Sequence, residues 1–190
     1  MRTPSIPLAL AALFAAAPAC ADPQTLQQMF GDRVAAAPGA KTPLAQGDFD
    51  GDGQADRIFL VTLAPAAGKS IAPDVQVVSG LFGGHAPGAG PGGHGLAIAL
   101  NGGAKKFLVL DVQATLSDGF FEGDIWTVVA AHLSPLTVKK RGSADLKGFP
   151  CLGKAAKGDV ALLGTEAGID IALPWTGTTF KKCVDPTAEP

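Results

Sequence analysis

The sequence predicts a mainly β protein: a single small domain of about seven or eight short antiparallel strands, preceded by a short helix. Short runs rich in β-branched and aromatic side chains recur along the chain, and Gly, Pro, Asn or Asp bounds each run. Between these runs the apolar residues show no helical spacing, which favours an all-β core. The length of 190 residues fits one domain or two small ones.

Residues 1–21 have the pattern of a secretory signal peptide. Arg2 gives the amino end a positive charge, residues 6–17 are almost wholly small or apolar, and Ala19-Cys20-Ala21 fits the small-x-small cleavage rule. We therefore expect export to the periplasm or the medium, with residues 1–21 removed. Two alternatives are an anchor that is kept and lipidation at Cys20, because the residues before it loosely resemble a bacterial lipobox.

The predicted mature domain covers residues 22–190. It holds no run of about 18 apolar residues, so we expect no stable membrane span after signal cleavage. The whole chain carries 15 basic and 17 acidic residues, which gives no basic surface for nucleic acid. Its remaining cysteines, Cys151 and Cys183, form an even pair in an exported chain and so predict one disulfide; two buried free thiols are the alternative.

A short amphipathic helix is expected at the start of the domain, over residues 23–36. Asp22 suits the N-cap position and Pro23 the first helical position, while Pro38-Gly39 would end the segment. The apolar residues between them recur at helical spacing: Leu26, Met29, Phe30 and Val34.

The strands follow as short apolar runs. Asn101-Gly102-Gly103 lies between two of them and is a hairpin signal, and residues 175–178 separate two more. The predicted strands are 57–63, 75–78, 96–100, 107–110, 125–129, 160–163, 169–173 and 178–180.

Residues 79–95 have a different composition, since eight of these 17 residues are glycine. Such a segment cannot form a packed element, and it predicts a mobile loop. His85 and His94 lie near its middle and its end. They can share a transition metal only with a third ligand, which is missing nearby.

Residues 47–56 read Gly-Asp-Phe-Asp-Gly-Asp-Gly-Gln-Ala-Asp and carry the strongest functional signal. Like charges about 4 Å apart repel by roughly 4 kcal/mol at an effective dielectric constant of 20. A hard divalent cation reverses this repulsion, and calcium prefers six to eight oxygen ligands. The predicted calcium ligands are the carboxylates of Asp48, Asp50, Asp52 and Asp56 and the backbone carbonyl of Gln54.

The glycines of this segment support the same reading. Gly51 and Gly53 permit the tight backbone twist that turns alternate aspartates toward one point. The first half matches an EF-hand loop, which has Asp at positions 1, 3 and 5 and Gly at position 6. Phe59 stands where an EF-hand has its bidentate Glu, and the exit is a predicted strand instead of a helix.

The pattern D-x-D-G-D-G-x-x-D from Asp48 to Asp56 resembles the calcium loop of FG-GAP or VCBS-type repeats, the kind found in integrin propellers. Phe30-Gly31 followed by Val34-Ala35 also resembles the strand that opens such repeats, an alternative to a helix there. The resemblance implies calcium and an adhesion-type module. Such families carry several loops and this chain has one, so we expect a single β-domain stabilised by one calcium loop instead of a closed propeller.

Other candidates are weaker. Asp118, Glu122 and Asp124 are interpreted as a polar turn, with a second cation site or the carboxylate pair of a small hydrolase as alternatives. The established nucleophile, zinc-protease and phosphate-loop motifs are absent from the sequence. The remaining residues are given structural roles: Trp126 and Trp175 in the core, and His132 and Lys139-Lys140-Arg141 at strand ends.

The sequence therefore predicts an exported, non-catalytic β-domain with one calcium loop and one disulfide. We expect calcium to be structural and the domain to act as a binding module for a protein or polysaccharide partner. The alternatives are an adhesion module that uses residues 79–95 as its contact surface, and a small hydrolase that uses Asp118, Glu122 or Asp124.

Overall fold

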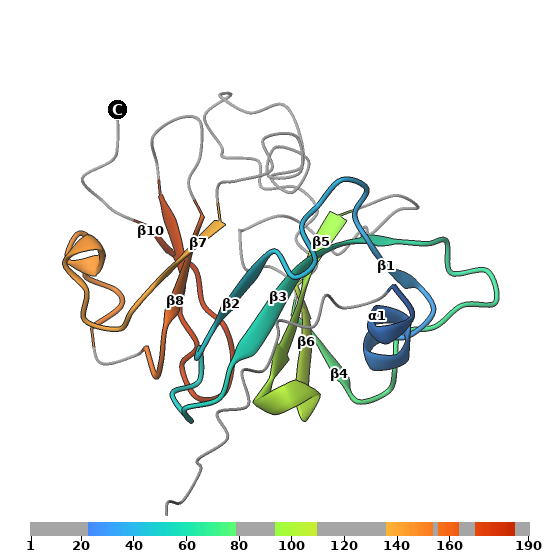
Figure 1. Ribbon diagram of the computed structural model, residues 1–190, viewed down its shortest axis with the longest axis horizontal. Coiled ribbons are helices and arrows are strands. Elements are labelled where there is room, and N and C mark those ends of the chain that lie inside the picture. The colour runs from blue at the N-terminus through green and yellow to red at the C-terminus, as the bar shows by residue number, and fades with distance from the viewer. Residues whose placement is uncertain (1–22, 79–93, 110–135, 154–155, 164–169, 185–190) are drawn as a thin grey trace, which may run out of the picture.

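A computed structural model describes residues 23–78, 94–109, 136–153, 156–163 and 170–184 (Figure 1). These residues form one short helix and ten strands in two sheets, which confirms the mainly β class. The elements are α1 (Pro23–Phe30), β1 (Val34–Ala36), β2 (Ala45–Gly47), β3 (Asp56–Leu63), β4 (Val75–Val78), β5 (His94–Leu100), β6 (Lys105–Val109), β7 (Leu136–Lys139), β8 (Val160–Leu163), β9 (Ile171–Leu173) and β10 (Cys183–Val184), with 3₁₀ turns η1 (Asn101–Gly103) and η2 (Ala144–Leu146).

The six-stranded sheet has the order β1-β3-β5-β6-β4. The long strand β3 pairs with β2 near its beginning, with β1 near its end and with β5 along its other side. All of these pairs are antiparallel, as is β5 with β6, whereas β4 runs parallel to β6. The predicted hairpin at residues 101–103 is confirmed, because η1 joins the antiparallel strands β5 and β6.

The four-stranded sheet has the order β10-β9-β8-β7 and is antiparallel throughout. Figure 1 shows α1 on one side of the six-stranded sheet and the strands β7, β8 and β10 on the other. The six-stranded sheet is therefore covered on both faces.

This layering explains why the strands are continuous apolar runs in the sequence. In β3, Ile58 and Leu60 pack in the core between the two sheets, while Phe59 and Val61 pack in a second cluster under α1. Side chains of a strand alternate between its two faces, and here both faces are buried. The stretch from Ile58 to Val61 therefore has no polar position to reveal its periodicity.

Three aromatic rings fill the space between the sheets. Phe107 on β6 lies with its ring centroid 4.9 Å from that of Trp175 and 5.7 Å from that of Phe180. Trp175 and Phe180 form an isolated bridge across the turn that contains residues 176–179. Trp175 is 3% exposed, which confirms it as a core residue.

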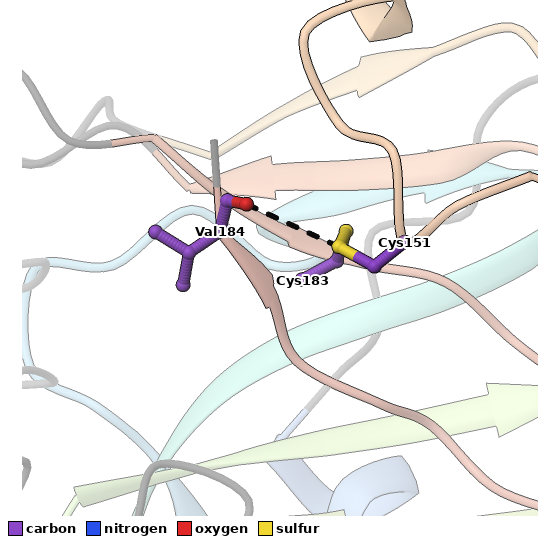
Figure 2. The surroundings of a disulfide bond; sticks show 3 residues. All are labelled: Cys151, Cys183 and Val184. Carbon is purple, nitrogen blue, oxygen red and sulfur yellow. Dashed lines mark hydrogen bonds between the residues drawn. A yellow bond between two sulfur atoms is a disulfide. The ribbon is translucent and has the colours of Figure 1, made fainter. Parts of the chain in front are cut away.

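The disulfide between Cys151 and Cys183 is present, with Cα atoms 5.8 Å apart (Figure 2). It ties the turn that follows η2 to the edge strand β10. Cys151 Sγ lies 3.9 Å from the carbonyl oxygen of Val184. A disulfide sulfur carries no proton to donate, so we treat this approach as a contact. Cys183 is buried in a cluster of apolar residues, whereas Cys151 is exposed. The other members of the cluster are Leu146, Phe149, Leu152, Ala156, Val160, Leu162 and Ala172.

The predicted helix is too long, because α1 ends at Phe30 and Val34 begins β1. Gly31 has φ +98°, a left-handed conformation that ends helices, and its N–H donates to the carbonyl oxygen of Gln27 at 2.8 Å. A Cβ on Gly31 would collide with the backbone of Ser70 and Ala72. The strand alternative for Val34-Ala35 is the one that the structure shows.

The prediction of seven or eight antiparallel strands is also wrong in detail. The described residues alone contain ten strands, and the β4–β6 pair is parallel. Residues 178–180 contribute only the bridge at Phe180, and His94-Gly95, assigned to the glycine-rich loop, belong to β5. The predicted strand at 125–129 lies outside the described residues.

Candidate metal centre

The acidic segment is the loop of a β-hairpin. β2 ends at Gly47 and β3 begins at Asp56, and these two residues are paired across the hairpin. The loop between them is therefore held at both ends by the six-stranded sheet. The sequence predicted this exit into a strand.

Asp56 organises the loop from inside. Its carboxylate is fully buried and accepts N–H bonds from Phe49 at 2.8 Å, from Asn101 at 2.9 Å and, more weakly, from Asp50 at 3.4 Å. Burial is the largest influence and raises the pKa of Asp56 above its usual 3.8; the Asp50 charge adds to the rise and the N–H bonds oppose it. A bound cation would favour the ionised form.

Asp48 holds the other side of the loop. Its Oδ1 accepts the N–H of Gly51 at 2.8 Å, and its Oδ2 accepts the N–H of Gly53 at 3.0 Å. Both glycines have positive φ, +79° and +86°. The twist that the sequence assigned to Gly51 and Gly53 is thus present, and it curls the backbone around one carboxylate.

Asp48, Asp50 and Asp56 form the candidate metal centre. Each offers one carboxylate oxygen, and these oxygens all lie within 4.8 Å of one another. The Asp50 side chain is only 5% exposed, and the cation nearest to it is Lys105, whose Nζ lies 3.7 Å from Oδ2 and whose side chain is half exposed. The Lys105 charge only partly neutralises the three carboxylates, so the group can hold a metal ion. A set of ligands that are all oxygen suits a hard cation.

The carboxylate of Asp52 is not among the three that converge, and the backbone carbonyl of Gln54 stays a predicted ligand. Asp52 accepts the backbone N–H of Gln54 at 2.7 Å and its side-chain amide at 3.2 Å. Both residues are exposed. They are hydrogen-bonded to each other in this structure, and their role as ligands stays a prediction.

Sequence reasoning missed a partner of the loop on the second sheet. Asp159 directly precedes β8, is 5% exposed, and bonds to both backbone groups of Asp48. Lys140, assigned only to a solvated strand end, donates to Asp159 Oδ2 at 2.7 Å. Asp159 is 111 residues from Asp48, and an isolated Gly-Asp pair before an apolar run gives no local signal for such a contact.

His85, Asp118, Glu122, Asp124, Trp126 and His132 lie outside the described residues. A hollow of about 230 Å³ elsewhere on the surface is lined, within the part of the chain that the structure describes, by Arg141, Lys147 and mostly small or apolar residues.

Among the described residues, no helix has the length and hydropathy that a bilayer span requires. Comparison with known proteins found no match to a protein-family model, to a curated protein or to a solved structure. The functional argument therefore rests on the residues of this chain.

Proposed function

We propose that the loop from Asp48 to Asp56 binds a calcium ion that stabilises an exported, non-catalytic β-domain. The observation that carries the proposal is the convergence of the Asp48, Asp50 and Asp56 oxygens within 4.8 Å. The positive charges beside the loop are those of Lys105, half exposed and paired with Asp50, and of Lys140, exposed and bonded to Asp159. Converging carboxylates repel one another unless a cation lies among them. A divalent ion turns the least favourable part of the hairpin into a stabilising one.

Calcium suits this set better than magnesium or zinc. Zinc prefers histidine and cysteine ligands, and the three carboxylates offer only oxygen. Magnesium demands a near-ideal octahedron, whereas calcium accepts an irregular shell of six to eight oxygens. The loop bends at two glycines with positive φ, so it can adjust to such a shell.

The role of the ion would be structural. Asp56 belongs to the cluster and is also the first residue of β3, which pairs with three other strands of the six-stranded sheet. An ion held there would fix the start of that strand. Extracellular calcium modules work with dissociation constants on the order of 10⁻⁴–10⁻³ M, and an exported domain would meet calcium in that range.

We further propose that the domain acts as a binding module for a protein or polysaccharide partner. This rests on the resemblance of the loop, from Asp48 to Asp56, to FG-GAP or VCBS-type repeats. Identification of that partner would require capture by the full-length protein.

The calcium proposal is tested by thermal unfolding of the chelated protein with and without added calcium. Calcium at ten times its dissociation constant should add about 1.4 kcal/mol to the free energy of unfolding. Asp50→Ala should abolish this response. It should leave the calcium-free protein as stable as before or more stable, because a repulsive charge is lost.

Asp74→Ala is the matched control. Asp74 is an exposed aspartate paired with Lys106 at the start of β4, away from the loop, and its variant should keep the full calcium response. Asp52→Ala should weaken calcium binding less than Asp50→Ala, because Asp52 bonds to Gln54 outside the cluster. An unchanged melting temperature in millimolar calcium, with no heat of binding, would refute the proposal.

A further inference from the structure

The segment before β8, residues 157–159, lies directly against the backbone of residues 48–56, which we call the metal loop for the ion proposed there. The N–H of Asp159 donates to the carbonyl oxygen of Asp48 at 2.6 Å, and the N–H of Asp48 donates to Asp159 Oδ2 at 3.1 Å. Both backbone groups of one proposed ligand are therefore held by a single residue of the four-stranded sheet.

Gly158 fits this contact because it has no side chain. A Cβ on Gly158 would collide with the carbonyl oxygen of Asp48, and it would lie 2.6 Å from the nitrogen of Gly51 and 2.7 Å from the carbonyl carbon of Phe49. Real Cβ atoms do not approach backbone atoms so closely, so any side chain at 158 must push the loop away.

The fit extends to Gly47, just before the loop, and to Gly51 within it. A Cβ on Gly47 would lie 2.8 Å from Val138 Cγ1 on β7 and 3.1 Å from Asp159 Oδ2. A Cβ on Gly51 would lie 2.5 Å from the carbonyl oxygen of Lys157. Three glycines thus mark the places where the hairpin of one sheet meets the edge of the other.

The negative charge of Asp159 is balanced by the positive charge of Lys140. Lys140 lies 2.7 Å from Asp159 Oδ2, and Asp159 is not among the three converging carboxylates. Asp159 can therefore orient Asp48 without competing for the ion. Residues that hydrogen-bond to metal ligands set the orientation of those ligands.

We propose that Gly158 and Asp159 are positioning residues for the metal loop, and that ion binding tightens the contact between the two sheets at this point. The inference rests on the proposed function. Asp48 is the shared element: its carboxylate belongs to the metal cluster and its backbone is bound by Asp159. Coupling of this kind is reciprocal, so whatever Asp159 does for ion affinity, the ion does for the Asp159 contact.

The Asp159 amide is the most direct reporter. Its hydrogen exchange, measured by NMR on the whole protein in EDTA and in saturating calcium, should slow about tenfold or more with the ion, which corresponds to a typical coupling between sites. The amide of Lys139 at the end of β7 provides a comparison within the same sheet.

Variants test the effect of Gly158 and Asp159 on calcium affinity. Gly158→Ala and Asp159→Ala should each weaken calcium affinity about 10-fold or more, the usual effect of removing a residue that orients a metal ligand. Asp159→Asn should restore part of the affinity, because its side-chain oxygen can still accept the Asp48 N–H. Asp145→Asn is the control: it breaks a similar lysine pair, at 2.8 Å to Lys139, without touching the loop.

The outcomes separate this inference from the proposed function. If calcium binds, yet Asp159 exchange is unchanged and Asp159→Ala keeps full affinity, the positioning role is overturned while the metal site stands. If no calcium binds to the native protein, both fail. If Gly158→Ala does not fold, Asp159→Asn and Asp159→Ala still decide the question. Asn keeps the acceptor for the Asp48 N–H without the charge, whereas Ala removes both.

Discussion

Two irregular segments of this protein are fixed by opposite means. The metal loop, residues 48–56, is held by carboxylates that accept backbone N–H groups. The turn that contains Cys151 is held by a covalent bond and by an apolar cluster on the outer face of the four-stranded sheet. The first depends on charge and the second does not.

The difference shows what each segment can respond to. Carboxylates can exchange protons or bind cations, so the metal loop can be sensitive to pH and to metal ions. A disulfide whose Cys183 packs with Leu146, Phe149 and Leu152 responds to neither. The protein thus has one segment that stays fixed and one that can be adjusted.

The largest expected effect is the loss of the disulfide. A Cys151→Ala/Cys183→Ala double variant should lose roughly 3–4 kcal/mol of unfolding free energy, because the cross-link closes a loop with a sequence separation of 32. Urea unfolding measures this loss. Calcium affinity should stay unchanged, since distant sites contribute independently; a parallel loss of affinity would contradict the separation of the two segments.

The next effect is the loss of the Asp56 carboxylate. Asp56→Ala leaves the N–H groups of Phe49 and Asn101 without their acceptor, so it should cost about 3 kcal/mol even in EDTA. Asp50→Ala removes only an exposed acceptor, that of the Asp52 N–H at 3.3 Å, and should leave stability unchanged or higher in the same urea series. Equal losses from the two variants would show that Asp56 does not organise the loop.

The smallest effect is a pH dependence. In EDTA, the raised pKa of Asp56 means that the folded protein binds its proton more tightly than the unfolded chain. Its contribution to stability is therefore greatest at low pH and falls as pH rises from 3.8 to the raised value.

Comparison of the native protein with Asp56→Asn, which cannot titrate there, isolates this contribution across the pH series. Added calcium should reverse the trend, because the ion favours the ionised carboxylate. A difference between the two proteins that stays constant with pH in EDTA would be inconsistent with a raised pKa.

Much of the fold could be predicted because its signals are local. The strands at 75–78 and 160–163 were predicted at their observed bounds, and that at 57–63 to within one residue. The helix was predicted too long because Val34 continues the helical spacing. The positive φ of Gly31 and its close approach to Ser70 and Ala72 ended it at Phe30.

The sequence by itself determined the aspartate segment and its exit into a strand, the disulfide partners and the apolar runs, because each depends on neighbours in the chain or on a simple count. Only the tertiary structure decided which carboxylates converge, and that Asp159 and Gly158 hold Asp48 from the other sheet. Contacts across 111 residues arise when two sheets bury their shared apolar faces. The polar residues at the rim of that interface are brought together by packing that leaves no mark in the local sequence.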